Sequence, residues 1–197
     1  MKVRLVVLLA ALALTMGFSA PASAGPVVIT FEGFAPPGGL RNISPGFPYS
    51  EAGFTLTPTT AQSAVFDSAY GSDFPGDLTD WFGFQEGNLI TITGPSPFGL
   101  TSLLIGRSTI AGTPSTDFTI VGRLAAGGFL TATYPGLATA TLATLNWSGL
   151  QSVEFSVTDD AGVDDIAINS PVPEPGSMLL LGTGLAGLGR AWRKRRG

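Results

Sequence analysis

The residues that could do chemistry are concentrated between Phe66 and Asn88. This stretch mixes carboxylates with aromatic rings: Asp67, Tyr70, Asp73, Phe74, Asp77, Asp80, Trp81, Phe82, Phe84 and Glu86. It lacks clear alternation and is expected to be a loop, and loops on rigid scaffolds often carry function. Because aromatic faces stack on sugar rings and carboxylates accept hydrogen bonds from hydroxyl groups, one interpretation is a carbohydrate site with Trp81 as stacking platform beside Asp80 and Tyr70. The alternative is a loop whose aromatic side chains form a small core of their own while its acids face solvent.

The amino-acid composition restricts what this chemistry can be. The 197 residues include no Cys and no His. Thiolate metal sites and every catalytic triad that uses His are therefore excluded. Glycoside hydrolysis needs only two carboxylates at a set separation, but nothing in the sequence marks such a pair. We therefore expect a protein that is not an enzyme.

Charge is distributed very unevenly along the chain. Residues 25–177 contain three Arg, no Lys and all 14 acidic residues, a net charge of −11. Such a surface repels the phosphates of DNA and RNA, so a nucleic acid partner is excluded. Divalent cations and neutral polymers remain as partners.

The N-terminus reads as a secretion signal. Two basic residues in the first four are followed by an almost wholly apolar run, and then by Ala22-Ser23-Ala24. A positive region, an apolar region and a small-residue cleavage site in this order are typical of a signal peptide. Residues 1–24 are therefore expected to be a signal helix that signal peptidase removes, with Gly25 as the first mature residue.

The C-terminus has three unlike parts in a fixed order. Prolines at 171, 173 and 175 make a stiff spacer around Val172-Pro173-Glu174-Pro175. A glycine-rich apolar run, 178–189, follows. The basic end, 190–196, contains Arg190, Arg193, Lys194, Arg195 and Arg196. Basic residues at this place stay cytoplasmic, so we expect a short transmembrane helix in the inner membrane.

This tail, 171–197, resembles the PEP-CTERM sorting domain, which is also catalogued as the ice-binding protein C-terminal domain. The resemblance implies export through the inner membrane of a Gram-negative cell and processing by an exosortase-type enzyme. The membrane anchor would then be transient, with delivery to the cell surface or the exopolysaccharide matrix. The tail acts as an address and implies little about the domain that it carries.

The exported domain, 25–170, is predicted to be all-β. About ten short runs alternate threonine with aliphatic residues and are separated by turn residues, which is typical of an antiparallel β-sandwich. Examples are 53–57, 118–122 and 152–157.

The order of these runs loosely resembles the galactose-binding-like jelly rolls of carbohydrate-binding modules. The resemblance rests on Phe31-Glu32-Gly33 in the first strand and Val163-Asp-Asp-Ile-Ala-Ile168 in the last. In such folds these strands are often neighbours, and a carboxylate from each can help to hold a structural calcium ion. Glu32 would then meet Asp164 or Asp165, and the sequence does not decide which of the two points inward. The alternative is that all three are solvated charges at strand ends.

Three functions follow from these observations. The first is a non-enzymatic surface or exopolysaccharide-matrix protein whose sandwich binds a glycan. The second is a structural or adhesive matrix component without a specific ligand, and the third is a glycan-active hydrolase.

Overall fold

The structure is a computed structural model that describes residues 26–70, 74–109 and 114–169. The predicted signal peptide, 1–24, and the predicted tail helix, 178–189, lie outside these residues. Within them, the expected all-β antiparallel architecture is confirmed, and the helical part is one short 3-10 turn, η1 (Ser68–Tyr70). No helix in this part of the chain is long and apolar enough to cross a membrane.

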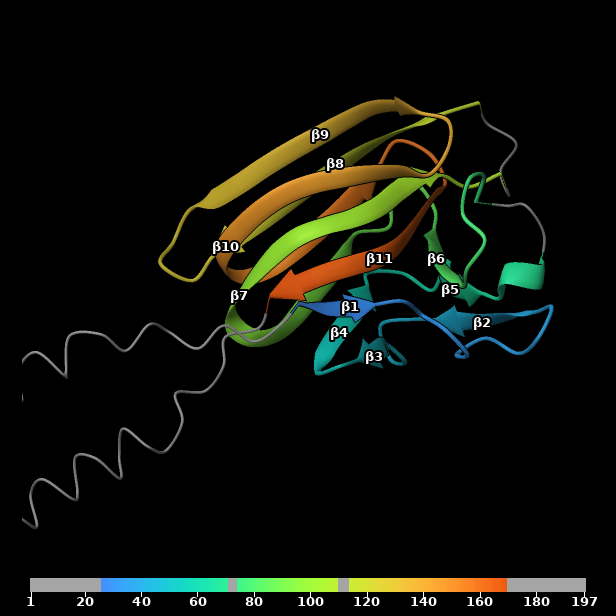
Figure 1. Ribbon diagram of the computed structural model, residues 1–197, viewed down its shortest axis with the longest axis horizontal. Coiled ribbons are helices and arrows are strands. Elements are labelled where there is room, and N and C mark those ends of the chain that lie inside the picture. The colour runs from blue at the N-terminus through green and yellow to red at the C-terminus, as the bar shows by residue number, and fades with distance from the viewer. Residues whose placement is uncertain (1–25, 71–73, 110–113, 170–197) are drawn as a thin grey trace, which may run out of the picture. The chain divides into compact units, whose positions relative to one another are not determined.

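Eleven strands make up the domain (Figure 1). They are β1 (Val27–Ile29), β2 (Leu40–Ile43), β3 (Tyr49–Glu51), β4 (Phe54–Pro58), β5 (Ser63–Phe66), β6 (Trp81–Phe84), β7 (Ile90–Arg107), β8 (Thr116–Leu124), β9 (Phe129–Leu137), β10 (Thr141–Val157) and β11 (Ala161–Asn169).

Two long strands turn this single hydrogen-bonded network into two layers. The first part of β7, 90–93, pairs with β4 and with the end of β10, which in turn pairs with β8 and then β9. The second part of β7, 99–107, pairs with β11, which continues to β6, β5 and β2. The register of β10 on β7 shifts three times between Thr144 and Ser152, where both strands bend. β7 and β10 are therefore shared by both layers of a sandwich.

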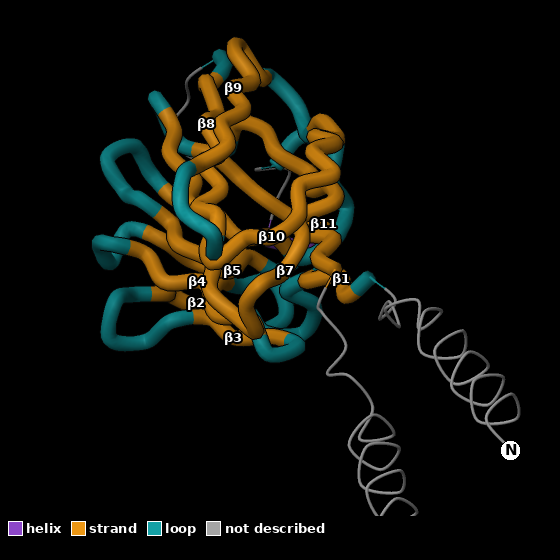
Figure 2. Tube along the Cα trace, turned by 90° about the vertical axis from the view of Figure 1, so that its left-hand side faces the viewer, coloured by secondary structure: helices purple, strands orange, loops and turns teal. Residues whose placement is uncertain are grey.

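The strands of the two layers are seen in Figure 2. Apolar residues from both layers meet in one core. In β4 the residues alternate between buried and partly exposed, as expected of a strand with one face against a core. Phe84, Phe118 and Phe155 continue the core across the sandwich, with ring centroids 5.8 and 5.5 Å apart in the two successive pairs.

Three strands fall where the sequence indicates none. β2 and β3 carry little apolar alternation, and β6 lies inside the stretch 66–88 that was expected to be a loop. All four residues of β6 are buried, because a second layer of side chains covers its outer face. A strand that is buried on both faces shows no period of two, which is why the alternation pattern misses it.

Candidate functional site

The aromatic residues of the stretch 66–88 form a small core on the outer face of β5 and β6. Trp81 is only 2% exposed and belongs to a cluster with Ala64, Phe66 and Phe74. Its ring stacks on Phe66 with the centroids 4.3 Å apart and 11° between the planes, and Phe74 lies 5.4 Å away. The expectation that Trp81 is an exposed sugar platform is therefore wrong, and its ring has the packing role of the alternative interpretation.

Asp80 also has a structural role. Its carboxylate accepts hydrogen bonds from the backbone N–H groups of Gly33 and Ser68, both at 2.9 Å, and its own N–H donates to Glu32 at 3.2 Å. The side chain is buried, and its oxygens join the turn after β1 to η1. Asp80 is therefore not available as a sugar ligand, in contrast to the prediction.

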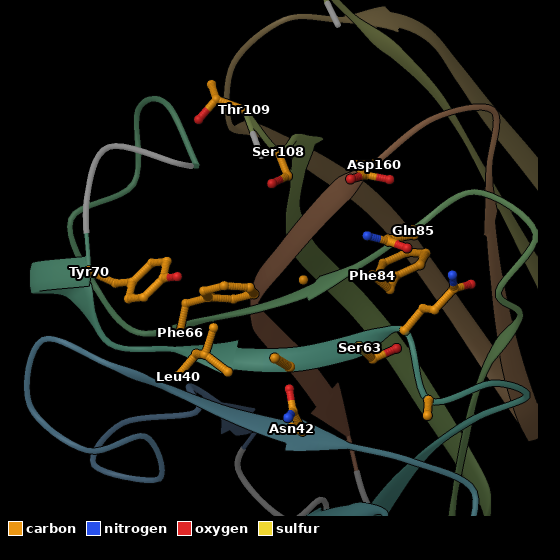
Figure 3. Close-up of a pocket in the computed structure, with 14 residues that line it drawn as sticks. Leu40, Asn42, Ser63, Phe66, Tyr70, Phe84, Gln85, Ser108, Thr109 and Asp160 are labelled. Carbon is orange, nitrogen blue, oxygen red and sulfur yellow. The ribbon is translucent and has the colours of Figure 1, made fainter. Parts of the chain in front are cut away.

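A pocket of about 600 Å³ opens beside the small core (Figure 3). Its residues come from β2, from β5 and the turn before it, from η1, from β6 and the residue after it, from the segment after β7 and from the turn before β11. They are Leu40, Asn42, Ala61, Gln62, Ser63, Ala64, Phe66, Tyr70, Gly83, Phe84, Gln85, Ser108, Thr109 and Asp160. This volume falls within the range of roughly 300–1,000 Å³ that is usual for small-molecule sites.

Tyr70 is the predicted sugar-binding residue that lies in this pocket. Its side chain is 42% exposed and its ring packs on Phe66, with the centroids 5.3 Å apart. The close-up shows these two rings on one side of the cavity and Gln85 and Asp160 on the other. An exposed ring braced by a buried one is a pre-formed surface for stacking, because little side-chain entropy remains to be lost.

The polar lining of the pocket consists mostly of neutral groups. Asn42, Gln62 and Gln85 contribute amides, which both donate and accept hydrogen bonds. Asp160 is the single formally charged residue of the lining and is 8% exposed. Burial raises the pKa of its carboxyl, and the nearby Asp159 and Glu86 carboxylates add to this shift.

Apart from Tyr70, sequence reasoning missed the polar residues of this pocket. In the strand register, Asn42 of β2 lies opposite Ala64 of β5. Ala64 in turn lies opposite Gly83 of β6. These positions come together only through strand pairing. No local pattern marks them in the sequence.

A second acidic group lies where β11 meets the segment after Phe74. Asp164 is fully buried whereas Asp165 is exposed, which decides the open question of which acid points inward. The Thr79 hydroxyl lies 2.6 Å from a carboxylate oxygen of Asp164 and 2.6 Å from one of Asp77. Burial raises the pKa of Asp164 to about 8, and the Asp77 and Asp165 carboxylates contribute to the shift.

The predicted calcium ligands do not form a joint site. Glu32 accepts its hydrogen bond from Asp80, whereas Asp164 is in contact with Thr79. Among the residues that the structure covers, no group of three or more acidic side chains is placed to hold one metal ion. A site built from Glu32, Asp164 and Asp165 together is therefore not present in this fold.

Comparison with family models identifies the tail. Residues 171–196 match the PEP-CTERM protein-sorting motif, as the sequence analysis predicts. The chain thus carries the sorting signal of exported, exosortase-targeted proteins. A comparison with curated proteins gives no match.

Several solved structures are similar to the chain at low identity. The carbohydrate-binding module TmCBM61, solved with β-1,4-galactotriose, is 10% identical, with 59% of this chain and 88% of the module covered and a TM-score of 0.39. A cleaved adhesin domain of Lys-gingipain from Porphyromonas gingivalis is 12% identical, with 75% and 99% covered and a TM-score of 0.38. The tandem CBM22 domain of Xyn10C from Paenibacillus barcinonensis is 12% identical, with 81% and 50% covered and a TM-score of 0.37.

Proposed function

We propose that this protein is an exported, non-enzymatic component of the cell surface or exopolysaccharide matrix, and that its sandwich binds a neutral glycan in the pocket at Tyr70. After removal of the signal peptide, the tail would hold the chain in the inner membrane until an exosortase-type enzyme processes it. The sorting motif supports the export route. The pocket supports glycan binding.

The observation that carries glycan binding is the combination of Tyr70 with an almost uncharged polar lining. A half-exposed ring offers a face to the C–H side of a sugar ring, and the amides of Asn42 and Gln85 suit hydroxyl groups. The one charge of the lining is the carboxylate of Asp160, which disfavours acidic polysaccharides. Neutral hexose polymers are therefore the favoured ligand class.

The same lining argues against hydrolysis. Retaining and inverting glycosidases both use a pair of carboxyl groups that flank the bond to be cleaved. Among the residues that line the pocket, Asp160 is the single carboxylate. Binding without turnover is therefore the function that the geometry supports best.

The glycan-binding proposal is tested with a panel of neutral and acidic polysaccharides, using the full chain in mild detergent. We expect a neutral member of the panel to bind, and Tyr70→Ala to weaken it by about tenfold, which corresponds to roughly 1.4 kcal/mol. Phe129→Ala is the matched control, because Phe129 is 71% exposed and lies outside the pocket. Binding that Tyr70→Ala leaves unchanged would refute the site, and a panel without any ligand would favour the purely structural matrix component.

The export route is tested by intact-mass analysis of the protein from fractionated cells. We expect the surface or matrix fraction to contain a chain that begins at Gly25 and has lost the residues beyond the motif at 172–175. A surface fraction that still carries the basic end, 190–196, would contradict processing.

A further inference from the structure

The segment 74–80, here called the strap, is attached to β11 at two points. At its first residue, the ring of Phe74 packs so closely on β11 that a Cβ atom at Gly162 would lie 2.9 Å from it. Near its end, the hydroxyl of Thr79 lies 2.6 Å from the carboxyl group of Asp164. One attachment is therefore apolar and the other is polar.

The polar attachment contains more short contacts than Thr79 has hydrogens. The Thr79 hydroxyl lies 2.6 Å from Oδ2 of Asp164 and 2.6 Å from Oδ1 of Asp77, yet a hydroxyl group donates one hydrogen. Two oxygens at this distance need a hydrogen between them. One of the two carboxyl groups must therefore carry a proton.

Burial assigns this proton to Asp164. Its side chain is 0% exposed, so ionisation would place a charge away from water. Asp77 is less buried, and its Oδ1 also accepts the N–H of Thr79 at 3.1 Å, which favours the ionised form. Burial raises the pKa of Asp164 to about 8, against the opposing hydrogen bonds from Thr79 and from the N–H of Asp165. The Asp164 carboxyl thus donates to Thr79, and Thr79 donates to Asp77.

Other charged or titratable groups lie on the elements around this attachment. They are Asp80 of the strap, Glu32 of the turn after β1, Tyr49 and Glu51 of β3, Arg107 of β7 and Asp165 of β11. Burial and the hydrogen bond to Glu51 raise the pKa of Tyr49, so its phenol stays neutral. Arg107 donates from Nε to the carbonyl of Ala138 at 2.7 Å. Burial and the Asp77 carboxylate also raise the pKa of Asp165, which therefore needs a control variant of its own.

We propose that Asp164, Thr79 and Asp77 form a proton-dependent latch, which holds the strap on β11 at neutral pH and releases it in alkaline solution. When Asp164 ionises, Thr79 can donate to one of the two carboxylates only. The other contact then has no hydrogen, and two negative charges repel each other across one hydroxyl group. Release lets water reach both carboxylates.

The latch is connected to the pocket through a series of rings. Phe74 of the strap lies 5.4 Å from Trp81, which stacks on Phe66, and Phe66 packs on Tyr70. A released strap holds Phe74 less firmly, so we expect glycan binding at Tyr70 to weaken in alkaline solution. This consequence rests on the proposed function, whereas the latch itself does not.

The test is hydrogen–deuterium exchange of the full chain in mild detergent, without glycan, from about pH 5 to pH 9.5. After correction for the intrinsic effect of pH on exchange, we expect the protection of the strap to fall by about tenfold per pH unit up to about pH 8, and then to level off. The reason is that the closed strap keeps a proton that the open strap has lost. Peptides from β8 are the internal control and should not follow this curve.

Three variants separate the latch from other causes. Asp164→Asn cannot ionise, and its amide can donate to Thr79 at every pH, so its strap should stay protected throughout. Asp165→Asn is the matched control, because it removes a charge from the adjacent, exposed position. It should keep the fall in protection, with the upper end at lower pH, since one negative charge near Asp164 is gone. Thr79→Val should show low protection at every pH.

Two results would overturn the proposal: strap protection in the unchanged protein that is constant with pH, or a fall in Asp164→Asn equal to that of the unchanged protein. If Asp164→Asn does not fold, Thr79→Val decides, and a pH-dependent fall like that of the unchanged protein would refute the latch. Glycan titration at pH 6 and pH 9 is a separate arm. Loss of affinity at pH 9 that Asp164→Asn prevents would support the connection to the pocket. A protein that binds no glycan would contradict the proposed function and leave the exchange result to decide the latch.

Discussion

The indole of Trp81 lies flat on the phenyl ring of Phe66, with 4.3 Å between the centroids. Trp81 begins β6 and Phe66 ends β5, and the two residues face each other directly in the strand register. The stack therefore sits on the outer face of the layer, and its Phe66 ring also packs against the pocket residue Tyr70, with the centroids 5.3 Å apart. The sequence analysis assigns Trp81 to ligand contact. In the structure Trp81 instead supports Phe66, and Phe66 supports Tyr70, whose exposed ring can contact a ligand.

Trp81→Ala is expected to act on stability. Truncation of a buried Trp typically costs about 3–5 kcal/mol of unfolding free energy, because a cavity remains and the stacked partner loses its contacts. Urea unfolding followed by circular dichroism measures this loss. Tyr70→Ala is the comparison, and we expect it to cost less than about 1 kcal/mol because the ring is half exposed. Equal losses for the two variants would contradict the division into support and contact surface.

Gly83→Ala should also destabilise the layer beneath the pocket. A Cβ atom at Gly83 would lie 2.6 Å from the ring of Trp81 and 2.7 Å from the ring of Phe66. Neither ring can move freely in a packed cluster, so we expect a loss of about 1–3 kcal/mol. Gly46→Ala is the matched control, because nothing lies within 4 Å of its Cβ position. Thermal melting of both variants checks the prediction, and a Gly83→Ala variant as stable as Gly46→Ala would show that the stack is loose.

Asn88 holds the turn between β4 and β5. Its side-chain oxygen accepts hydrogen bonds from the N–H groups of Thr59 and Thr60, both at 3.0 Å, and its amide nitrogen donates to the Ser63 hydroxyl at 2.6 Å. Because Asn88 is buried, Asn88→Ala leaves these groups unsatisfied, and we expect a loss of about 1–3 kcal/mol in denaturant unfolding.

The control for that variant is Asn169→Ala. Asn169 is exposed and donates one hydrogen bond, to the Thr101 hydroxyl at 2.9 Å. Its removal should change stability by less than about 0.5 kcal/mol. If Asn88→Ala costs as little unfolding free energy as Asn169→Ala, solvent already reaches the polar groups of the turn between β4 and β5.

Strands with one solvated face could be predicted from the sequence, and strands with two covered faces could not. β4 and β8 alternate between apolar and polar residues because one side of each packs on the core. In contrast, Trp81–Phe84 is apolar on both sides, since the small core covers the outer face. Its aromatic residues therefore resemble a binding loop when the sequence is read alone.

The pocket could not be predicted for a different reason. Asn42, Gln85 and Asp160 are far apart in the chain, and each is an ordinary polar residue in its local context. Their proximity depends on the register of β2 on β5 and β5 on β6, and on the turn that leads into β11. The inward position of Asp164 likewise depends on the register shift that follows it, next to Asp165, whose φ is 47°.

Asp160→Asn should make the protein more stable at neutral pH. Burial raises the pKa of the Asp160 carboxyl above its ordinary value, so the folded chain keeps this proton at a pH where the unfolded chain has lost it. The contribution of Asp160 to stability is therefore lost as the pH rises from the ordinary pKa of an Asp carboxyl through the raised pKa of the folded chain. Because the Asn side chain cannot ionise, the Asp160→Asn variant does not lose stability in this way. The gain in unfolding free energy of the variant should grow with pH across that window and then level off.

Urea unfolding of the variant and the unchanged protein over a series of pH values measures this difference. Subtraction of the two curves removes the contribution of Asp164, which both proteins share. Glu86→Gln provides a second arm, because removal of that nearby negative charge should shift the Asp160 transition to lower pH. A difference between Asp160→Asn and the unchanged protein that is constant with pH would show that Asp160 titrates alike in the folded and unfolded chains, and that the pocket is wetter than its burial indicates.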